Sequence, residues 1–372
     1  MIDVLNIISD SNIGGAGRCV LNFLKYYDRS AFCVTVAVPR GSLLIPALCD
    51  LKTPYVEVDG IAETSFSMQG VKNLYRVIGQ VNPQVVHTHG NFSGRIAAKL
   101  RGKKIVYTRH SVFPVSHRID HGIGKWLNGR INEFFSDQIL AVAQAAKENL
   151  IDSGVRPERI EVVLNGVESL VPLSEEEKGA VRQQYGIQQG DFVLGILARV
   201  EPYKGHRYLL EAAKIMKQHG RKIRVIIAGV GDALEDLKTL AEQWNITDIV
   251  CFAGFVQDVR SLLSVLDLQI NASYGTEATS LSLLEGMSLG LPAVVSDYGG
   301  NPGVITEGQN GLLVPQKDGQ ALAAAVERLM GDPALLAQLK AGAKARFASS
   351  FTAKIYAGNI EQVYRQTAER RN

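Results

Sequence analysis

The sequence has no apolar run of about 18 residues, the length that a membrane-spanning helix needs. Its four cysteines, at positions 19, 33, 49 and 251, have the spacing of neither a disulfide framework nor a zinc site. The first residues, MIDVLNIISDS, lack a basic leader, so we predict a strand at Val4–Ile8 and no signal peptide. We therefore expect a cytoplasmic protein with reduced thiols.

Neither sign of charge is in large excess over the chain as a whole, since the net charge is only +3. The exception is residues 95–130, which contain nine Lys or Arg and a single acid, Asp120. Such a stretch favours anions on one face. Its basic residues do not fall on one recognition helix, so we do not expect nucleic acid as a partner.

The chain is too long, at 372 residues, for one ordinary core, and its 46% of apolar residues are typical of globular proteins. Apolar runs typical of buried strands alternate with helical patterns at 70–80 and 124–135 and restart after a break at 165–172. These strands are predicted at 34–38, 84–89, 104–108, 138–142, 192–198, 223–229, 248–254, 267–272 and 292–296. Two such series predict an α/β protein with two parallel sheets, followed by helices only beyond residue 318.

The first candidate motif is IISDSNIGGAGR, in which Gly14 and Gly15 lie between a strand and a helix. Glycines let backbone N–H groups approach a phosphate, and a helix N-terminus favours negative charge, so Gly14 and Gly15 are predicted to face a donor phosphate. A simple tight turn explains the same pattern equally well. The glycines of AGVGDA at 228–233 are a weaker signal of the same kind.

The second candidate motif is LARVEPYKGH, in which Arg199 ends a strand and Lys204 opens the next helix. Ligands of open α/β sheets lie beyond the carboxyl ends of the strands. The two cations are therefore candidates to neutralise a diphosphate, with surface salt bridges as the alternative.

The third candidate motif lies at 274–300, where Glu277 follows a strand and Glu285 comes eight residues later inside a helix. The helix start, at Thr279, Ser280 and Leu281, offers backbone N–H groups to a phosphate or sugar. The two carboxylates can accept hydrogen bonds from ribose and sugar hydroxyls. For Glu285 the alternative is a capping or surface acid.

Together these stretches resemble the family 4 retaining glycosyltransferases of GT-B fold. The family's motifs appear in order along nearly the whole chain, with Thr279-Ser280 standing where the family often has Phe-Gly. The matching stretches are GGAGR, TRHS at 108–111, NGVE at 165–168, ARVEPYKG at 198–205, Glu277-x7-Glu285 and PAVVSDYGGNPGVI.

The resemblance implies two Rossmann-like domains that face a deep cleft. Residues 1–168 would bind the acceptor, with the terminal helix 352–372 packed back on them, and residues 169–351 would bind the donor. The donor would be a nucleotide-diphosphate sugar, a UDP- or GDP-sugar. The reaction would transfer a hexosyl unit from it to a glycan or lipid-linked acceptor.

The resemblance also implies roles for single residues. Arg199 and Lys204 would hold the diphosphate, and His110 would face the sugar and the acceptor; a hydrogen bond within the core is its alternative. No Asp-x-Asp motif is present, so we expect neither a metal nor another cofactor. His87 and His89 form a His-x-His pair, but no third metal ligand is evident.

Retention of configuration follows from the family alone, and we expect a front-face substitution in which the donor phosphate helps to deprotonate the acceptor. Residues 95–130, with Phe113 and Trp126 among the bases, predict a peripheral contact with an anionic membrane at the inner face of the cell membrane. The alternative to this contact is a set of solvated basic helix faces. Alternatives for the whole protein are a nucleotide-sugar epimerase, a dinucleotide oxidoreductase and a catalytically silent sugar-nucleotide binding module.

Overall fold

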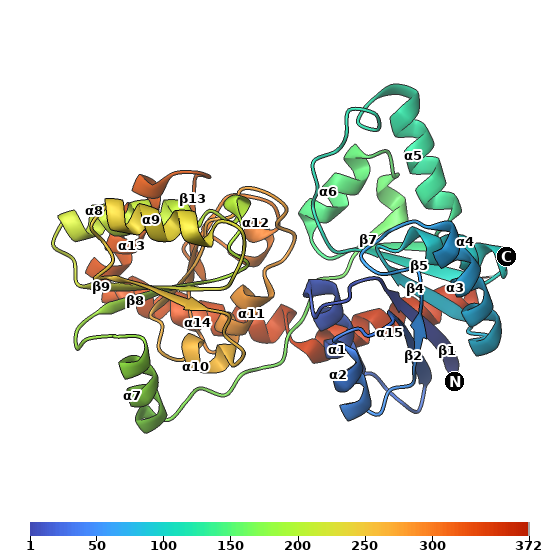
Figure 1. Cartoon of the computed structure of the whole chain (residues 1–372), viewed down its shortest axis with the longest axis horizontal. Helices are drawn as coiled ribbons and strands as arrows, with labels where there is room; N and C mark the ends of the chain where they lie inside the picture. Colours follow the sequence, from blue (N-terminus) through green and yellow to red (C-terminus); the bar gives the residue numbers. More distant parts are fainter. Residues whose placement is uncertain (371–372) are drawn as a thin grey trace. The chain divides into compact units, whose positions relative to one another are not determined.

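The computed structural model describes residues 1–370, and their contacts divide into two compact units. The first unit contains residues 1–167 and the terminal segment from Thr352, and the second contains residues 168–351 (Figure 1). The sequence had placed this boundary one residue later. The last two positions of the expected terminal helix, 371 and 372, lie outside the described residues.

The first unit is built on a seven-stranded parallel sheet in the order β3-β2-β1-β4-β5-β6-β7. Its strands are β1 (Ile2–Ile8), β2 (Phe32–Pro39), β3 (Tyr55–Val58), β4 (Val85–His89), β5 (Lys104–Arg109), β6 (Gln138–Ala141) and β7 (Ile160–Val162). Strands β1, β4 and β6 are almost wholly buried, because helices cover both faces of the sheet.

The helices of the first unit include a final one that returns from the far end of the chain. They are α1 (Gly15–Tyr26), α2 (Ile45–Asp50), α3 (Met68–Val81), α4 (Phe92–Leu100), α5 (Gly122–Phe134), α6 (Gln144–Asp152), the 3₁₀ turn η1 (Pro157–Arg159) and α15 (Ala353–Glu369). Helix α15 packs against α1 and lies over strands β1, β4 and β5. Its Tyr364 is fully buried beside Phe23 and Phe32, so the returning helix completes this core.

The second unit has a six-stranded parallel sheet in the order β10-β9-β8-β11-β12-β13. Its strands are β8 (Phe192–Leu197), β9 (Ile223–Ala228), β10 (Val250–Gly254), β11 (Leu268–Asn271), β12 (Ala293–Ser296) and β13 (Gly311–Val314). Its helices are α7 (Glu175–Gln184), the 3₁₀ turn η2 (Pro202–Lys204), α8 (His206–Gln218), α9 (Leu234–Gln243), α10 (Val259–Leu263), α11 (Leu281–Ser288), α12 (Asn301–Val304), α13 (Gly319–Gly331) and α14 (Pro333–Ser350).

The order of the strands positions the ligand-binding edges of both sheets. The direction of winding reverses between β1 and β4 in the first unit and between β8 and β11 in the second. At such a reversal the loops that leave neighbouring strands diverge and open a crevice at the carboxyl ends. Every site residue predicted from the sequence lies in a loop or helix start that follows β1, β5, β8 or β11, or in helix α11 after β11.

Candidate active site

The loops after β8 and β11 form the candidate site of the second unit. Arg199 and Lys204 follow β8, and Glu277 follows β11, so the reversal in strand order places all three at the same edge of the sheet. A small pocket opens between these strands and the start of α11. Its lining includes Leu197, Ala198, Asn271, Ser273, Ser280 and Ser282.

Lys204 and Glu277 form a buried ion pair at this edge. The Lys204 Nζ lies 2.7 Å from Glu277 Oε2, and the side chains are only 14% and 6% exposed. Ser273 Oγ donates to the same carboxylate oxygen at 3.0 Å, and Asn271 Nδ2 donates to it at 3.4 Å. These three contacts all reach Oε2, so Oε1 is the oxygen better placed to accept a hydrogen bond from a ligand.

The loop that carries Glu277 is held in an unusual conformation. Thr276, a β-branched residue, adopts the left-handed region with φ of 44°, where such residues are strained. The Glu277 carbonyl accepts a hydrogen bond from Gly300 N–H, and a Cβ on the neighbouring Gly299 would come within 2.1 Å of that carbonyl oxygen. The close approach of the Gly299–Gly300 backbone fixes the position of Glu277, and the neighbouring Thr276 adopts the strained backbone conformation.

Helix α11 begins at this loop with Ser280 as its N-cap. The Ser280 side chain accepts a hydrogen bond from Leu283 N–H, which leaves the N–H groups of Leu281 and Ser282 to find partners outside the helix. Thr279, just before the cap, is half-buried. Glu285 lies about one turn into the helix and is only 5% exposed, which excludes the surface acid considered from the sequence.

Arg199 and Lys204 differ in their surroundings. Arg199 is exposed, and its guanidinium donates a 3.0 Å hydrogen bond to the Tyr203 hydroxyl. Strand β8 ends at Leu197, so Arg199 lies two residues beyond it. The prediction that Lys204 opens a helix is wrong: it closes the 3₁₀ turn η2, and α8 starts after Gly205. Gly205 has φ of 75°, which requires glycine and separates the turn from the helix.

A buried histidine follows directly on this turn. His206 is 1% exposed, and neither of its ring nitrogens has a hydrogen-bond partner among the described residues. Burial, together with the nearby charge of Lys204, lowers the pKa of His206 to about 4, so the ring is neutral at pH 7. The sequence offered no signal for this, because a histidine at a helix start is usually exposed.

The glycine loop of the first unit leads into α1, with Gly14 as the N-cap and Gly15 as the first, exposed helical residue. A Cβ on Gly14 would lie 3.1 Å from Asp10 Oδ2. Burial and the charge of Glu63 raise the pKa of Asp10. A carboxyl group beside the loop opposes a second negative charge there, which favours a hydroxyl-bearing group over a phosphate.

His110 follows β5 and belongs to a chain of histidines at the carboxyl ends of β4 and β5. Its Nε2 lies 2.8 Å from Nδ1 of His89, and the other nitrogen of His89 lies 3.0 Å from Oδ1 of Asn6. As the Asn6 amide is oriented, its oxygen accepts from His89 Nε2–H. His89 Nδ1 then accepts from His110 Nε2–H, so Nδ1 of His110 remains as an acceptor.

Burial keeps this chain neutral. It lowers the pKa of His87 to about 3 and that of His110 to about 4, and it lowers the pKa of His89 well below its usual value. His87 stacks near His89 and bonds to Tyr364 and Thr108 through its two nitrogens. Both nitrogens of each residue of the His-x-His pair are thus engaged in hydrogen bonds. Within residues 1–370, no group of three His, Cys, Asp or Glu is arranged to hold a metal ion.

The basic stretch 95–130 does not form a single surface. Arg95 is 5% exposed, with its guanidinium 4.1 Å from the Tyr107 ring centroid, so it cannot contact an external anion. Arg109 donates to the Asn149 side chain, and Arg101 lies over the Tyr75 ring. Of the other bases in this stretch, Lys125 and Arg130 lie on α5, and Lys99 lies over the ring of Phe134 in the same helix. Over the described part of the chain, no helix is both long enough and apolar enough to cross a membrane.

These two units define a class: α/β proteins of two parallel sheets, each with polar groups gathered at the carboxyl edge where the strand order reverses. Comparison with known families identifies the particular one. Residues 13–169 match the model described as Glycosyltransferase Family 4, and residues 177–346 match the one described as Glycosyl transferases group 1. The chain belongs to these glycosyltransferases, whose fold is GT-B.

Individual relatives agree with this assignment. The amylovoran biosynthesis glycosyltransferase AmsK of Erwinia amylovora is 28% identical over 76% of this chain and 68% of its own. The UDP-Gal:alpha-D-GlcNAc-diphosphoundecaprenol alpha-1,3-galactosyltransferase of Escherichia coli is 28% identical over 72% of each chain. HepE of Anabaena, solved with UDP and glucose, superposes with a TM-score of 0.84 at 21% identity over 98% of this chain and 99% of its own.

Proposed function

We propose that the protein is a retaining glycosyltransferase that transfers a hexosyl unit from a UDP- or GDP-sugar to a glycan or lipid-linked acceptor during synthesis of a bacterial cell-surface polysaccharide or lipopolysaccharide. The observation that carries the proposal is the buried Lys204–Glu277 pair beside the start of α11, at the edge where ligands of such sheets bind. The names of the relatives support it: one belongs to amylovoran biosynthesis and another uses UDP-Gal with a diphosphoundecaprenol acceptor.

In this proposal the second unit binds the donor. The exposed guanidinium of Arg199 and the ammonium of Lys204 neutralise the diphosphate, and backbone N–H groups at the start of α11, around Thr279, Ser280 and Leu281, bind phosphate or sugar oxygens. Glu285 accepts hydrogen bonds from the ribose hydroxyls. Glu277 accepts one from the sugar through Oε1, while Oε2 keeps Lys204 in place.

The same proposal assigns the chemical step. The acceptor hydroxyl oxygen bonds to the anomeric carbon on the face from which the diphosphate leaves, and a phosphate oxygen takes the hydroxyl proton. The charge that develops on the leaving group is stabilised by the two cations without a metal. His110, neutral and with Nδ1 as an acceptor, orients a hydroxyl of the sugar or the acceptor, and Gly14 and Gly15 border the acceptor.

Thermal shift with a panel of nucleotides and nucleotide sugars tests the donor assignment. A ligand present at about 100 times its dissociation constant should stabilise the protein by about 2.7 kcal/mol. We expect UDP or GDP sugars to raise the melting temperature of the wild type and to do so far less in Arg199→Met. A panel in which dinucleotides bind and nucleotide sugars do not would contradict the proposal and favour an oxidoreductase.

The anomeric configuration of the product tests retention. Proton NMR of the first product, or of slow donor hydrolysis, should show the configuration of the donor. An inverted product would rule out the front-face route, and a kinetically competent sugar adduct on Glu277 would replace it with a covalent one. Isomerised donor with no transfer would favour the epimerase. Tight donor binding without any turnover would favour the silent module.

A further inference from the structure

Helix α5 has an apolar face that the rest of the first unit leaves largely exposed. The residues of this face recur at the spacing of one helical stripe, which is the pattern of a helix that buries one side. They are Ile123, Trp126, Leu127, Ile131 and Phe134, with exposed fractions of 82%, 61%, 49%, 38% and 61%. Only Gly129 is buried in the whole helix, so the large apolar side chains are not its packing side.

The helix is attached to its unit through glycines. A Cβ on Gly129 would lie 1.8 Å from the carbonyl oxygen of Gly154, and one on Gly154 would lie 1.9 Å from that of Lys125. Gly124 similarly lies close to the Arg118 carbonyl. This close backbone packing fixes α5 by one side at the margin of the first unit (Figure 1). The apolar stripe is therefore held rigidly in an outward position.

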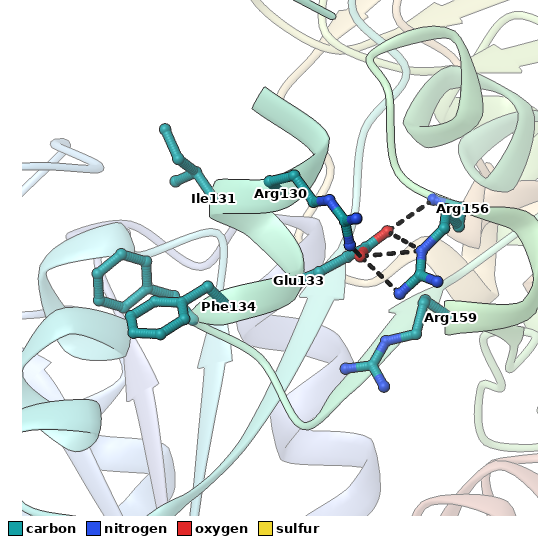
Figure 2. Close-up of a pocket in the computed structure, with 7 residues that line it drawn as sticks. Arg130, Ile131, Glu133, Phe134, Arg156 and Arg159 are labelled. Atoms are coloured by element: carbon teal, nitrogen blue, oxygen red, sulfur yellow. Dashed lines mark hydrogen bonds and ion pairs between the residues drawn. The ribbon is translucent and has the colours of Figure 1, made fainter. Parts of the chain in front are cut away.

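A basic hollow continues from the end of this stripe. It has a volume of about 550 Å³ and combines apolar walls with three arginines (Figure 2). Its lining residues are Arg130, Ile131, Glu133, Phe134, Phe135, Arg156 and Arg159. Glu133 contacts Arg156 at 2.8–3.0 Å and Arg130 at 3.7 Å. The three arginines therefore share one acid, and the lining keeps an excess of positive charge.

We propose that this face docks the protein on a bilayer of anionic phospholipid, with the stripe of α5 in the interface and a lipid phosphate in the basic hollow. Apolar aromatic side chains flanked by bases are what an anionic interface recognises. Lys99 and Arg130 add to this, since they lie over the rings of Phe134 and Trp126 and surround the stripe with charge. A second copy of the chain fits less well, because it would bring two basic rims together.

This inference goes beyond the proposed function, because docking needs neither donor nor acceptor. Flotation of the whole protein with phosphatidylcholine vesicles, with and without phosphatidylglycerol, is the direct test. We expect binding only to the anionic vesicles, weakened by salt. The Trp126→Glu, Phe134→Glu double variant should lower the partition coefficient at least about tenfold. Arg159→Gln should lower it about fivefold.

Matched controls separate this face from general stickiness. Met68→Glu replaces a side chain that is 73% exposed on α3 of the same unit, and it should leave vesicle binding unchanged. The protein has two tryptophans, so Trp244→Phe leaves Trp126 as the sole reporter. Its emission should shift to the blue on anionic vesicles and be quenched by brominated lipid. Circular dichroism melts establish that each variant is folded.

Several outcomes would overturn the proposal. These are equal binding to neutral and anionic vesicles, unchanged binding of the double variant, or a Trp126 spectrum that vesicles do not alter. A wild-type dimer that the double variant abolishes, seen in sedimentation without any vesicle binding, would assign the face to a second copy instead. Donor hydrolysis measured without vesicles tests the proposed function separately, and we expect it to be the same in the double variant.

Discussion

The Lys204–Glu277 pair provides the sharpest test of how the second unit is built. Lys204→Ala would leave the Glu277 carboxylate, whose side chain is only 6% exposed, with two neutral donors, Asn271 and Ser273. Removing one partner of a buried pair typically costs about 3–5 kcal/mol, because the other charge stays buried and uncompensated. We expect a loss of that size in the free energy of unfolding, without any ligand present.

The remaining variants complete a thermodynamic cycle. Glu277→Ala should cost less, about 1–3 kcal/mol, because the longer Lys204 side chain is more exposed and can turn toward water. The double variant Lys204→Met, Glu277→Leu should be more stable than Lys204→Ala alone, since no charge is left behind. Urea unfolding followed by circular dichroism measures all three differences.

An exposed pair of the same length in the same unit is the control. Lys238 and Glu235 are also 2.7 Å apart, but their side chains are 42% and 79% exposed. Lys238→Ala should therefore change stability by no more than about 1 kcal/mol. If Lys204→Ala costs no more than this control, the pair is not desolvated in solution, and the assignment of Lys204 as a fixed, donor-facing cation loses its basis.

Three further results are expected. Burial lowers the pKa values of His87, His110 and His206 to about 3, 4 and 4 in the folded protein. Their contribution to the free energy of unfolding is therefore full above about pH 6.5 and falls as the pH drops toward these values. Urea unfolding at pH 7 and pH 5 should differ by about 2 kcal/mol per histidine, and an unchanged midpoint would contradict the burial. Asn6→Leu removes the hydrogen-bond acceptor that orients His89 and, through it, His110. This variant should lower kcat about tenfold or more with little change in the donor KM. Equal effects on kcat and KM would indicate a general structural defect. Arg199→Met should raise the donor KM about tenfold and change the free energy of unfolding by no more than about 0.5 kcal/mol, because the side chain is exposed. Calorimetry with the nucleotide would measure the affinity, and urea unfolding would measure the stability. An unaltered affinity would remove Arg199 from the site.

The sequence predicted the central strands well, for a physical reason. A parallel sheet covered on both faces requires continuous apolar runs, and such runs are easily recognised. The strands that were not predicted are β3, β7 and β13, each at the edge of its sheet. They have three or four residues each, and in β3 only the last residue is buried. Pairing with a neighbour, which no local pattern encodes, makes them strands.

The site was predicted through the rule that ligands lie at the carboxyl ends of strands. That rule selected Arg199 and Lys204, and the spacing to Glu285 selected Glu277. Neither could pair Lys204 with Glu277, because the two are 73 residues apart. Asn271 and Ser273, which fix the carboxylate, carry no signal of their own in the sequence. The positive φ of Thr276 is equally hidden, since threonine disfavours that conformation and only the surrounding contacts impose it.

The histidine chain shows why position along the sequence is a poor guide to this site. His87 contacts Tyr364, 277 residues later, and Tyr364 Oη also donates to Asn6 at 3.4 Å, across 358 residues. The whole second unit, residues 168–351, lies between these partners in the chain. The hydrogen bonds of His87 and Asn6 are therefore completed only when α15 returns to the first sheet. Because these contacts are non-local, the first unit reaches its final packing only after the last helix has been made.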